Sequence, residues 1–148
     1  MTEYRNVRAE RLHSLTVGIF SKLGMPQEDA AKMGDILVDA DLRGVLSHGT
    51  RFVPIYAKWI RDGWVNLNPQ IKVVAESTAT AAFEADDSLG HLVSVKAMEY
   101  CIDKAKQHGI GLAGVRNSGH FGMAALYVAQ AAEADCLGFA FTNASKAL

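Results

Sequence analysis

The chain has 148 residues, of which 49% are hydrophobic and 21% charged, and its formal net charge at pH 7 is −1. This length and composition fit a single globular domain with a sizeable core. The near-neutral charge, without a basic stripe, argues against a nucleic-acid partner. The first ten residues are too polar for a signal peptide, and no apolar run approaches a membrane span. We therefore expect a cytoplasmic protein with no membrane partner.

Metal and disulfide sites are not expected. The two cysteines, Cys101 and Cys136, lie in apolar segments and form no CxxC motif. We expect them to be buried free thiols, as is typical of a reducing cytosol. No cluster of His, Cys, Asp and Glu has the spacing of a metal site.

The first part of the chain has helical periodicity. Apolar residues recur at helical spacing over residues 8–23, and Gly24 supplies a stop. A second helix is expected from Pro26 to about Leu42. A third is expected to begin near Ser47 or His48 and to end before residues 62–63. Residues 1–68 therefore form a helical segment.

The pattern changes at Pro69 to short strands that alternate with helices. Strands are predicted at residues 71–75, 79–85, 110–115 and 137–142, and helices at residues 91–107 and from 121 or 122 to 134. The result is an α/β fold in which three helices are followed by a hairpin and a β–α–β–α–β order. Residues 69–148 would form the α/β segment, which we expect to be incomplete because only six residues follow its last strand.

The first chemical motif is Ser47-His48-Gly49-Thr50-Arg51. If a helix begins here, Ser47 is a natural N-cap, and His48 and Arg51 share a face. Histidine can pass a proton near neutral pH, and arginine can bind a carboxylate through two hydrogen bonds. This combination suits a 2-oxo or 2-hydroxy acid. The alternative is a capped helix with an exposed histidine and a solvated arginine.

The second motif runs from Asn117 to Gly122 between a predicted strand and an Ala-rich helix, and it contains His120. Glycines in such a turn let a phosphate approach backbone amides at a helix N-terminus. The spacing is only GxxG and not the GxGxxG fingerprint. The alternative is a tight turn that simply needs glycine. Outside these motifs, His91 is most simply a first-turn residue, and Asp41 is expected to make surface or loop contacts.

Together these motifs resemble the malate/L-lactate dehydrogenase family that is unrelated to the Rossmann-type lactate and malate dehydrogenases. Its members include ureidoglycolate, sulfolactate and diketogulonate oxidoreductases. The matching features, in chain order, are Asp41-x-Arg43-Gly44-x-x-Ser47-His48-Gly49-x-Arg51, Gly90-His91 with Ala97-Met98, Arg116-x-Ser118-Gly119-His120-Phe121-Gly122 with Tyr127 and Ala131, and Gly138-Phe139-Ala140-Phe141-Thr142-Asn143.

The resemblance implies an oxidoreductase that uses NAD or NADP to interconvert a 2-hydroxy acid and a 2-oxo acid. It implies that His48 is the proton donor, Ser47 its orienting partner and Arg51 the ligand of the substrate carboxylate. His120 is a further acid–base candidate. Contacts with the cofactor are implied for His120, Phe121, Gly122, Met123 and Ala124.

The family is usually homodimeric, and its active site draws on both subunits. Its members continue well beyond Asn143, so the chain resembles the N-terminal part of such an enzyme. Two other hypotheses stay open on the sequence. One is a catalytically inert N-terminal fragment that only folds, dimerises or binds a ligand, and the other is a small-molecule binding module without redox chemistry.

Overall fold

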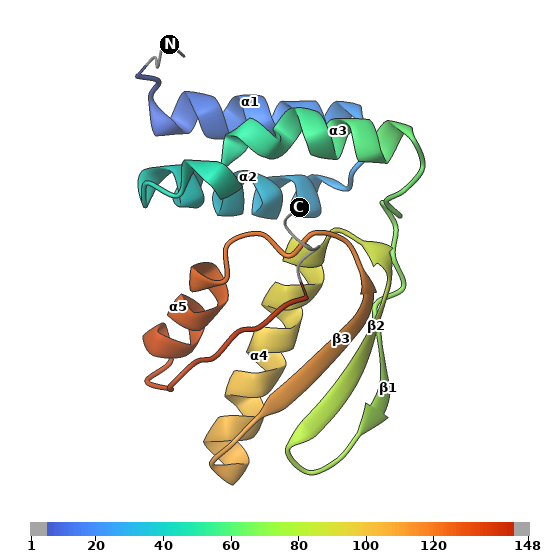
Figure 1. The fold of residues 1–148 in the computed structure, drawn as a ribbon, viewed down its shortest axis with the longest axis vertical. Helices are drawn as coiled ribbons and strands as arrows, with labels where there is room; N and C mark the ends of the chain where they lie inside the picture. Colours follow the sequence, from blue (N-terminus) through green and yellow to red (C-terminus); the bar gives the residue numbers. More distant parts are fainter. Residues whose placement is uncertain (1–5, 144–148) are drawn as a thin grey trace. The chain divides into compact units, whose positions relative to one another are not determined.

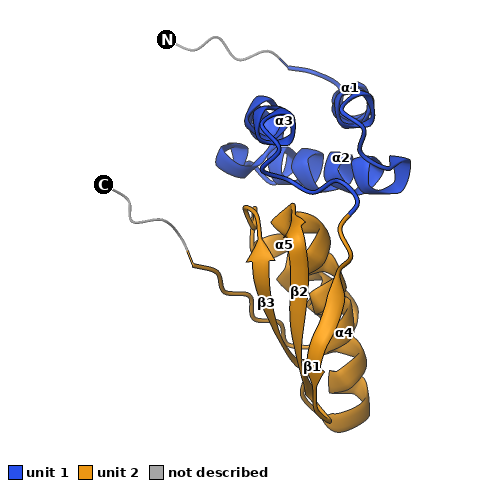
Figure 2. Ribbon diagram, turned by 90° about the vertical axis from the view of Figure 1, so that its right-hand side faces the viewer, with its two compact units in different colours: residues 1–68 blue, residues 69–148 orange. Residues whose placement is uncertain are grey.

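The computed structural model describes residues 6–143 and divides the chain into two compact units, residues 1–68 and residues 69–148 (Figure 2). The first unit contains three α-helices, and the second contains a three-stranded sheet with two further α-helices (Figure 1). The α/β class expected from the sequence is confirmed. No helix within residues 6–143 has the length and apolar character needed to cross a bilayer.

The helical unit begins with α1 (Ala9–Lys22) and α2 (Gln27–Leu42), close to the predicted ranges. Gly24 follows α1 with a φ of +93°, a conformation that glycine adopts at little cost and that ends the helix. The third helix, α3 (Val53–Arg61), completes the unit. Large side chains from all three helices are fully buried in its core, namely Phe20, Met33, Leu37 and Tyr56.

The third helix begins later than the sequence predicted. Two short 3-10 turns, Leu46–His48 and Thr50–Phe52, precede it, and Gly49 interrupts them with an extended backbone. Pro54 lies at the start of α3, where the missing amide hydrogen costs little. Ser47 is therefore not the N-cap of a helix, contrary to the prediction.

The second unit is built on a sheet with strand order β1-β2-β3. Strand β1 (Lys72–Glu76) pairs antiparallel with β2 (Thr80–Ser88), which confirms the predicted hairpin. Strand β2 pairs parallel with β3 (Leu112–Ser118), and α4 (Gly90–His108) connects the two. In Figures 1 and 2, α4 covers one face of the sheet, and α5 (Ala125–Glu133) lies beside α4.

The core of this unit lies between β2 and α4. Alternate residues of β2 are buried, as expected for a strand with one face against a helix. The buried cluster consists of Ala81, Phe83, Ala85, Val93 and Ala97. The small residues let the helix pack closely on the sheet, and Tyr100 packs edge-on against Phe83 with ring centroids 5.6 Å apart.

The strand predicted at residues 137–142 is absent, so this prediction was wrong. After α5 the chain turns at Asp135 (φ +56°) and runs back along the helices without joining the sheet (Figure 1). Gly138 lies against α5, because a Cβ built there would be only 2.7 Å from the Cβ of Ala131. The small residue therefore packs on the helix. The large ones, Leu137, Phe139 and Phe141, are 93%, 75% and 86% exposed.

A glycine on α1 provides a test of the helical unit. Gly18 lies in the middle of α1 with open space around the position of a Cβ. We expect Gly18→Ala to raise the free energy of unfolding by about 0.5–1 kcal/mol, since alanine loses less backbone entropy in a helix. Urea denaturation measures the difference. Gly34→Ala in α2 is the matched control and should not stabilise, because its Cβ would be 2.7 Å from Val17 Cγ2.

Candidate active site

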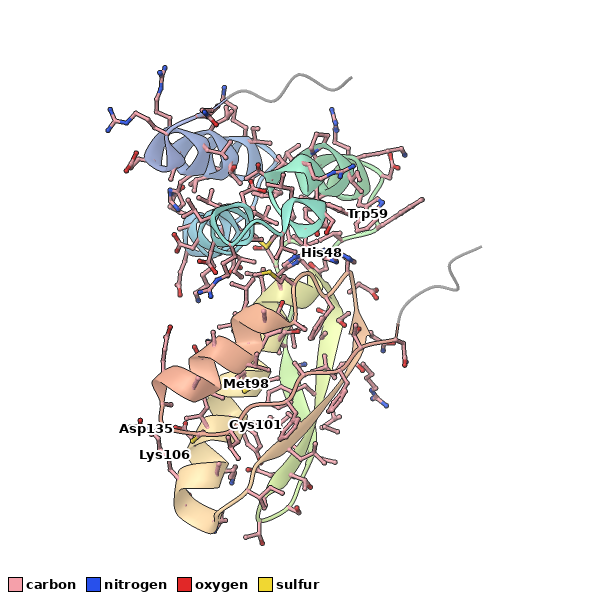
Figure 3. The ribbon with its side chains drawn as sticks, turned by 60° about the vertical axis from the view of Figure 1, so that its left-hand side comes forward. His48, Trp59, Met98, Cys101, Lys106 and Asp135 are labelled. Atoms are coloured by element: carbon pink, nitrogen blue, oxygen red, sulfur yellow. The ribbon has the colours of Figure 1, made fainter. Side chains whose placement is uncertain are left out.

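The first motif forms a turn between α2 and α3 in which Ser47 and His48 touch. The Ser47 Oγ lies 2.9 Å from His48 Nδ1, so the hydroxyl can fix the ring orientation and the tautomer. The His48 ring is also nearly parallel to the Phe52 ring, with centroids 6.3 Å apart and an interplanar angle of 15°. Figure 3 labels His48 at this turn.

The turn is held in place by Asp41 at the end of α2. Its Oδ2 accepts hydrogen bonds from the amide of Thr50 at 3.1 Å and from the Thr50 hydroxyl at 2.5 Å. Gly49 has room only for a hydrogen, because a Cβ there would overlap the Asp41 carboxylate. The expected loop contact of Asp41 is thus present, and Thr50 is its partner. The sequence did not identify Thr50 as the partner, because nine residues separate the two.

Removing this carboxylate should loosen the turn. We expect Asp41→Ala to lower the free energy of unfolding by about 1–3 kcal/mol, since a part-buried amide and a hydroxyl lose a charged acceptor. Thermal denaturation followed by circular dichroism measures the effect. Asp39→Ala is the matched control, because Asp39 makes an exposed ion pair with Arg43 at 2.6 Å, and its loss should cost no more than about 0.5 kcal/mol. Equal losses in the two variants would contradict the assigned role of Asp41.

Arg51 lies in the second 3-10 turn and is exposed. The interruption at Gly49 means that His48 and Arg51 do not share the face of one helix, which corrects the spacing argument made from the sequence. The structure therefore brings Ser47 and His48 together by direct contact. Arg51 remains near them along the chain, with its side chain accessible to solvent.

The second motif forms a loop over residues 119–124 between β3 and α5. The amide of Gly119 donates to the carbonyl oxygen of Ser88 at 2.8 Å. A Cβ at Gly90 would collide with the backbone of the loop, at 2.6 Å from the carbonyl oxygen of His120. The start of α4 and the start of this loop therefore lie in direct contact, which only glycine at position 90 permits.

Tyr127 holds the other end of the loop. Its hydroxyl donates to the carbonyl oxygen of Phe121 at 2.5 Å, and the two rings lie 4.7 Å apart. Tyr127 is 1% exposed, and burial raises the pKa of its hydroxyl well above the usual range. The hydroxyl therefore stays protonated and remains a donor at physiological pH. Because of this loop, α5 begins later than predicted, at Ala125.

His91 packs against this loop. It lies in the first turn of α4, as the sequence predicted, and is fully buried. Its ring meets the His120 ring edge-on, with centroids 5.9 Å apart and an interplanar angle of 64°. Gly122 has a φ of +78°, and a Cβ there would lie 2.6 Å from His91 Cδ2. The sequence holds both histidines and both glycines, but no local pattern pairs them.

A polar cluster fixes the strand ends that lead into this region. The carboxylate of Glu84 accepts from Arg116 Nε at 2.7 Å and from Asn117 Nδ2 at 2.9 Å. The Asn117 amide and the Arg116 guanidinium hold the pKa of the Glu84 carboxyl below its usual range. This links β2 to β3 just before the loop that carries His120. The Arg116 side chain is thus paired with a carboxylate of the neighbouring strand.

The loop occupies a position in the fold that is typical of nucleotide-binding turns. It follows the carboxyl end of a parallel strand and precedes a helix, which is where open α/β sheets bind ligands. Gly119 and Gly122 carry no side chain, and the positive φ of Gly122 turns the backbone there. Residues 120–124 therefore fit a cofactor-binding role. Within residues 6–143, no group of three His, Cys, Asp or Glu side chains could hold a metal ion.

His48 belongs to the helical unit and His120 to the α/β unit. Comparison with known proteins relates both motifs to one family. Residues 7–148 match the malate/L-lactate dehydrogenase family, and the chain belongs to it.

Individual relatives agree with this assignment. The chain is 41% identical over 140 residues to a malate dehydrogenase of Pyrococcus abyssi, covering 95% of this chain and 39% of the relative. It is 41% identical over 142 residues to an L-sulfolactate dehydrogenase of Methanocaldococcus jannaschii, covering 96% of this chain and 41% of that protein.

A solved structure, the malate dehydrogenase from Pyrococcus horikoshii OT3, superposes with a TM-score of 0.86 at 45% identity. The superposition covers 88% of this chain and 37% of that one. The fold expected from the resemblance is therefore confirmed for the part that is shared. The chain spans about two fifths of the length of the curated relatives it matches.

Proposed function

We propose that the chain is part of an oxidoreductase that uses NAD or NADP to interconvert a 2-hydroxy acid and a 2-oxo acid. The observation that carries the proposal is the Ser47–His48 pair, with its 2.9 Å contact, in a chain of the malate/L-lactate dehydrogenase family. The relatives named above are dehydrogenases of malate and sulfolactate, which are both 2-hydroxy acids.

In this proposal His48 moves the proton. During reduction of a 2-oxo acid, the protonated ring donates from Nε2 to the substrate oxygen while Nδ1–H donates to the Ser47 hydroxyl. During oxidation, the neutral ring accepts the proton of the substrate hydroxyl at Nε2. Ser47 and the stacked Phe52 ring restrict the rotation of the His48 ring during both reduction and oxidation.

The acid group of the substrate is assigned to Arg51. A guanidinium can bind a carboxylate with two parallel hydrogen bonds, which fixes the orientation of the adjacent carbon. Arg51 is exposed, so its head group is accessible to a ligand.

The cofactor is assigned to His120, Phe121, Gly122, Met123 and Ala124, in the loop between β3 and α5. A bound nicotinamide supplies hydride transfer to and from the substrate's C2 carbon. The residues of the loop bind and orient, and His120 is a second candidate for proton exchange. As part of the same proposal, the whole enzyme acts as a homodimer in the cytoplasm.

The test is to follow oxidation of NADH and NADPH by the 148-residue chain with a panel of 2-oxo acids such as pyruvate and oxaloacetate. Binding of each nucleotide is measured in parallel by its fluorescence. Turnover supports the proposal and shows that these residues suffice. Nucleotide binding without turnover supports a cofactor-binding part of the enzyme. The absence of both would contradict the proposal for this chain and favour the inert fragment.

Arg51 provides a sharper prediction. We expect Arg51→Lys to raise the KM for the 2-oxo acid by about tenfold and to leave the Kd for NADH unchanged, because lysine cannot form the paired contact. Steady-state kinetics measure the change. Arg61→Lys at the end of α3 is the control, because Arg61 donates to a backbone carbonyl of its own helix. A lower kcat with unchanged KM would contradict the assignment to the carboxylate.

A further inference from the structure

We propose that Tyr127 is a positioning residue whose hydroxyl fixes the orientation of the peptide between Phe121 and Gly122. In that orientation the amide hydrogen of Gly122 points away from Tyr127 and is available to an oxygen atom of the cofactor. The inference rests on the proposed function only for this last contact. The orientation of the peptide follows from contacts within the α/β unit.

The donor is a buried hydroxyl that carries a single hydrogen. Tyr127 is 1% exposed, and its hydroxyl donates to the carbonyl oxygen of Phe121 at 2.5 Å. Burial raises the pKa of Tyr127, and a hydrogen bond with Ser94 of α4 acts against that rise. A neighbour lowers the pKa of a tyrosine when it donates to the phenolic oxygen, because it then stabilises the charged form. Ser94 is therefore the donor in its contact, and the hydrogen of Tyr127 is directed at Phe121.

The planar peptide bond transfers this constraint to Gly122. The peptide bonds of the described residues are trans, and in a trans peptide the C=O and N–H groups point in opposite directions. Because the Phe121 oxygen is turned toward Tyr127, the amide hydrogen of Gly122 is turned away from it. Gly122 is partly exposed, and within residues 6–143 its amide donates to no other protein group. This N–H can therefore donate to a bound molecule.

Glycine at position 122 leaves the backbone able to take the opposite orientation. Its φ is +78°, and half a turn of the peptide plane would give a negative φ, which glycine adopts about as readily. That turn would move the Phe121 oxygen away from Tyr127 and leave a buried hydroxyl without its acceptor, which costs free energy. The backbone alone therefore does not select one orientation, whereas the hydrogen bond from Tyr127 does.

The experiment measures the direction of the Gly122 N–H by NMR of the isotope-labelled 148-residue chain without cofactor or substrate. The readout is the nuclear Overhauser cross-peak between the Gly122 amide hydrogen and the ring hydrogens at position 127. The variant is Tyr127→Phe, which removes the hydroxyl but keeps the ring that lies 4.7 Å from the Phe121 ring. Ser94→Ala is the matched control, because it removes the other hydroxyl of the pair and leaves the Tyr127 donor in place. Backbone amide spectra and melting temperatures show whether each variant keeps the fold.

We expect no strong cross-peak in the wild type or in Ser94→Ala, because the N–H points away from the ring. In Tyr127→Phe no hydrogen bond holds the Phe121 oxygen inward, so the peptide should sample both orientations and the cross-peak should appear in an otherwise native spectrum. A folded Tyr127→Phe chain without the cross-peak would overturn the proposal, because ring packing alone would then fix the peptide. An equally strong cross-peak in Ser94→Ala would also overturn it.

A measurement on the wild type covers the case in which Tyr127→Phe does not fold. The buried hydroxyl hydrogen of Tyr127 should exchange slowly with water and give its own NMR signal, with cross-peaks to residues 121 and 122. Cross-peaks to Ser94 alone would show that the hydrogen points the other way and would overturn the proposal. Exchange as fast as that of the exposed Tyr100 hydroxyl would also contradict it.

The contact with the cofactor is tested by titration with NADH. If the chain binds NADH, Tyr127→Phe should raise the Kd by about tenfold, as expected for the loss of one hydrogen bond. Tyr100→Phe should leave the Kd unchanged, because the Tyr100 hydroxyl donates to Glu76 at 3.1 Å and lies outside the loop. An unchanged Kd in Tyr127→Phe would overturn the contact between the Gly122 amide and the cofactor. A chain that binds no NADH contradicts the proposed function, whereas the NMR experiment still decides the orientation of the peptide.

Discussion

Replacing His48 with alanine is expected to lower turnover by about 10²–10⁴-fold, the usual contribution of a positioned acid–base group. The Kd for NADH should stay unchanged, because the cofactor is assigned to the loop over residues 120–124. Steady-state kinetics and fluorescence titration measure the two quantities on the same preparation. Ser47→Ala should have a smaller effect of about tenfold, since it removes only the group that orients the ring.

The control for this prediction is His108→Ala, because His108 is exposed at the end of α4 and outside both motifs. It should retain the wild-type rate. If His48→Ala keeps its activity while His120→Ala loses it, the proton-transfer role moves to His120. Loss of activity in His48→Ala together with loss of the folded spectrum would instead indicate that His48 supports the turn.

The second large effect is expected at Gly90. A Cβ at this position would lie 2.6 Å from the carbonyl oxygen of His120 and would also overlap that of Gly119. Both obstacles are backbone atoms, so no side-chain rotation relieves them. We expect Gly90→Ala to lower the free energy of unfolding by about 2–4 kcal/mol and to displace the loop that carries His120.

Urea denaturation measures this loss. Gly114→Ala is the matched control within the same unit, because a Cβ on Gly114 meets no atom within 4 Å. That variant should unfold at the wild-type urea concentration or slightly above it, since alanine loses less backbone entropy than glycine. A Gly90→Ala protein as stable as the control would show that the start of α4 and the loop are not in close contact in solution.

The sequence predicted best those elements whose ends are marked locally. Gly24 and Gly44 follow the first two helices with φ values of +93° and +76°, and their positions are visible in the sequence as breaks in an apolar repeat. The third helix was placed too early because its start depends on Asp41, which lies nine residues before its partner Thr50. A local pattern does not report such a contact.

The prediction of a strand at residues 137–142 was wrong for a related reason. Alternation of large and small apolar residues is typical of a strand, but a strand also needs a neighbour with which to pair. In this unit the small Gly138 packs on α5 instead. The alternation of large and small residues is present, but the small residue faces a helix and the segment does not pair with a strand.

The candidate site also contains one contact that the sequence could predict and one that it could not. Ser47 and His48 are adjacent, so their contact could be expected from the motif. His91 and His120 are 29 residues apart, and they meet because β2 and β3 pair parallel with Ser88 opposite Ser118. That register brings the start of α4 to the start of the loop. It depends on tertiary structure, which no motif in the sequence encodes by itself.

The exposed apolar side chains of the last described segment affect the colloidal behaviour of the chain. Leu137, Phe139 and Phe141 lie in water, and full burial of each would gain about 1.5–3 kcal/mol. A net charge of −1 provides little repulsion between molecules. Both features act in the same direction, so concentrated solutions of the chain are prone to self-association through this segment, and added sulfate should strengthen that association.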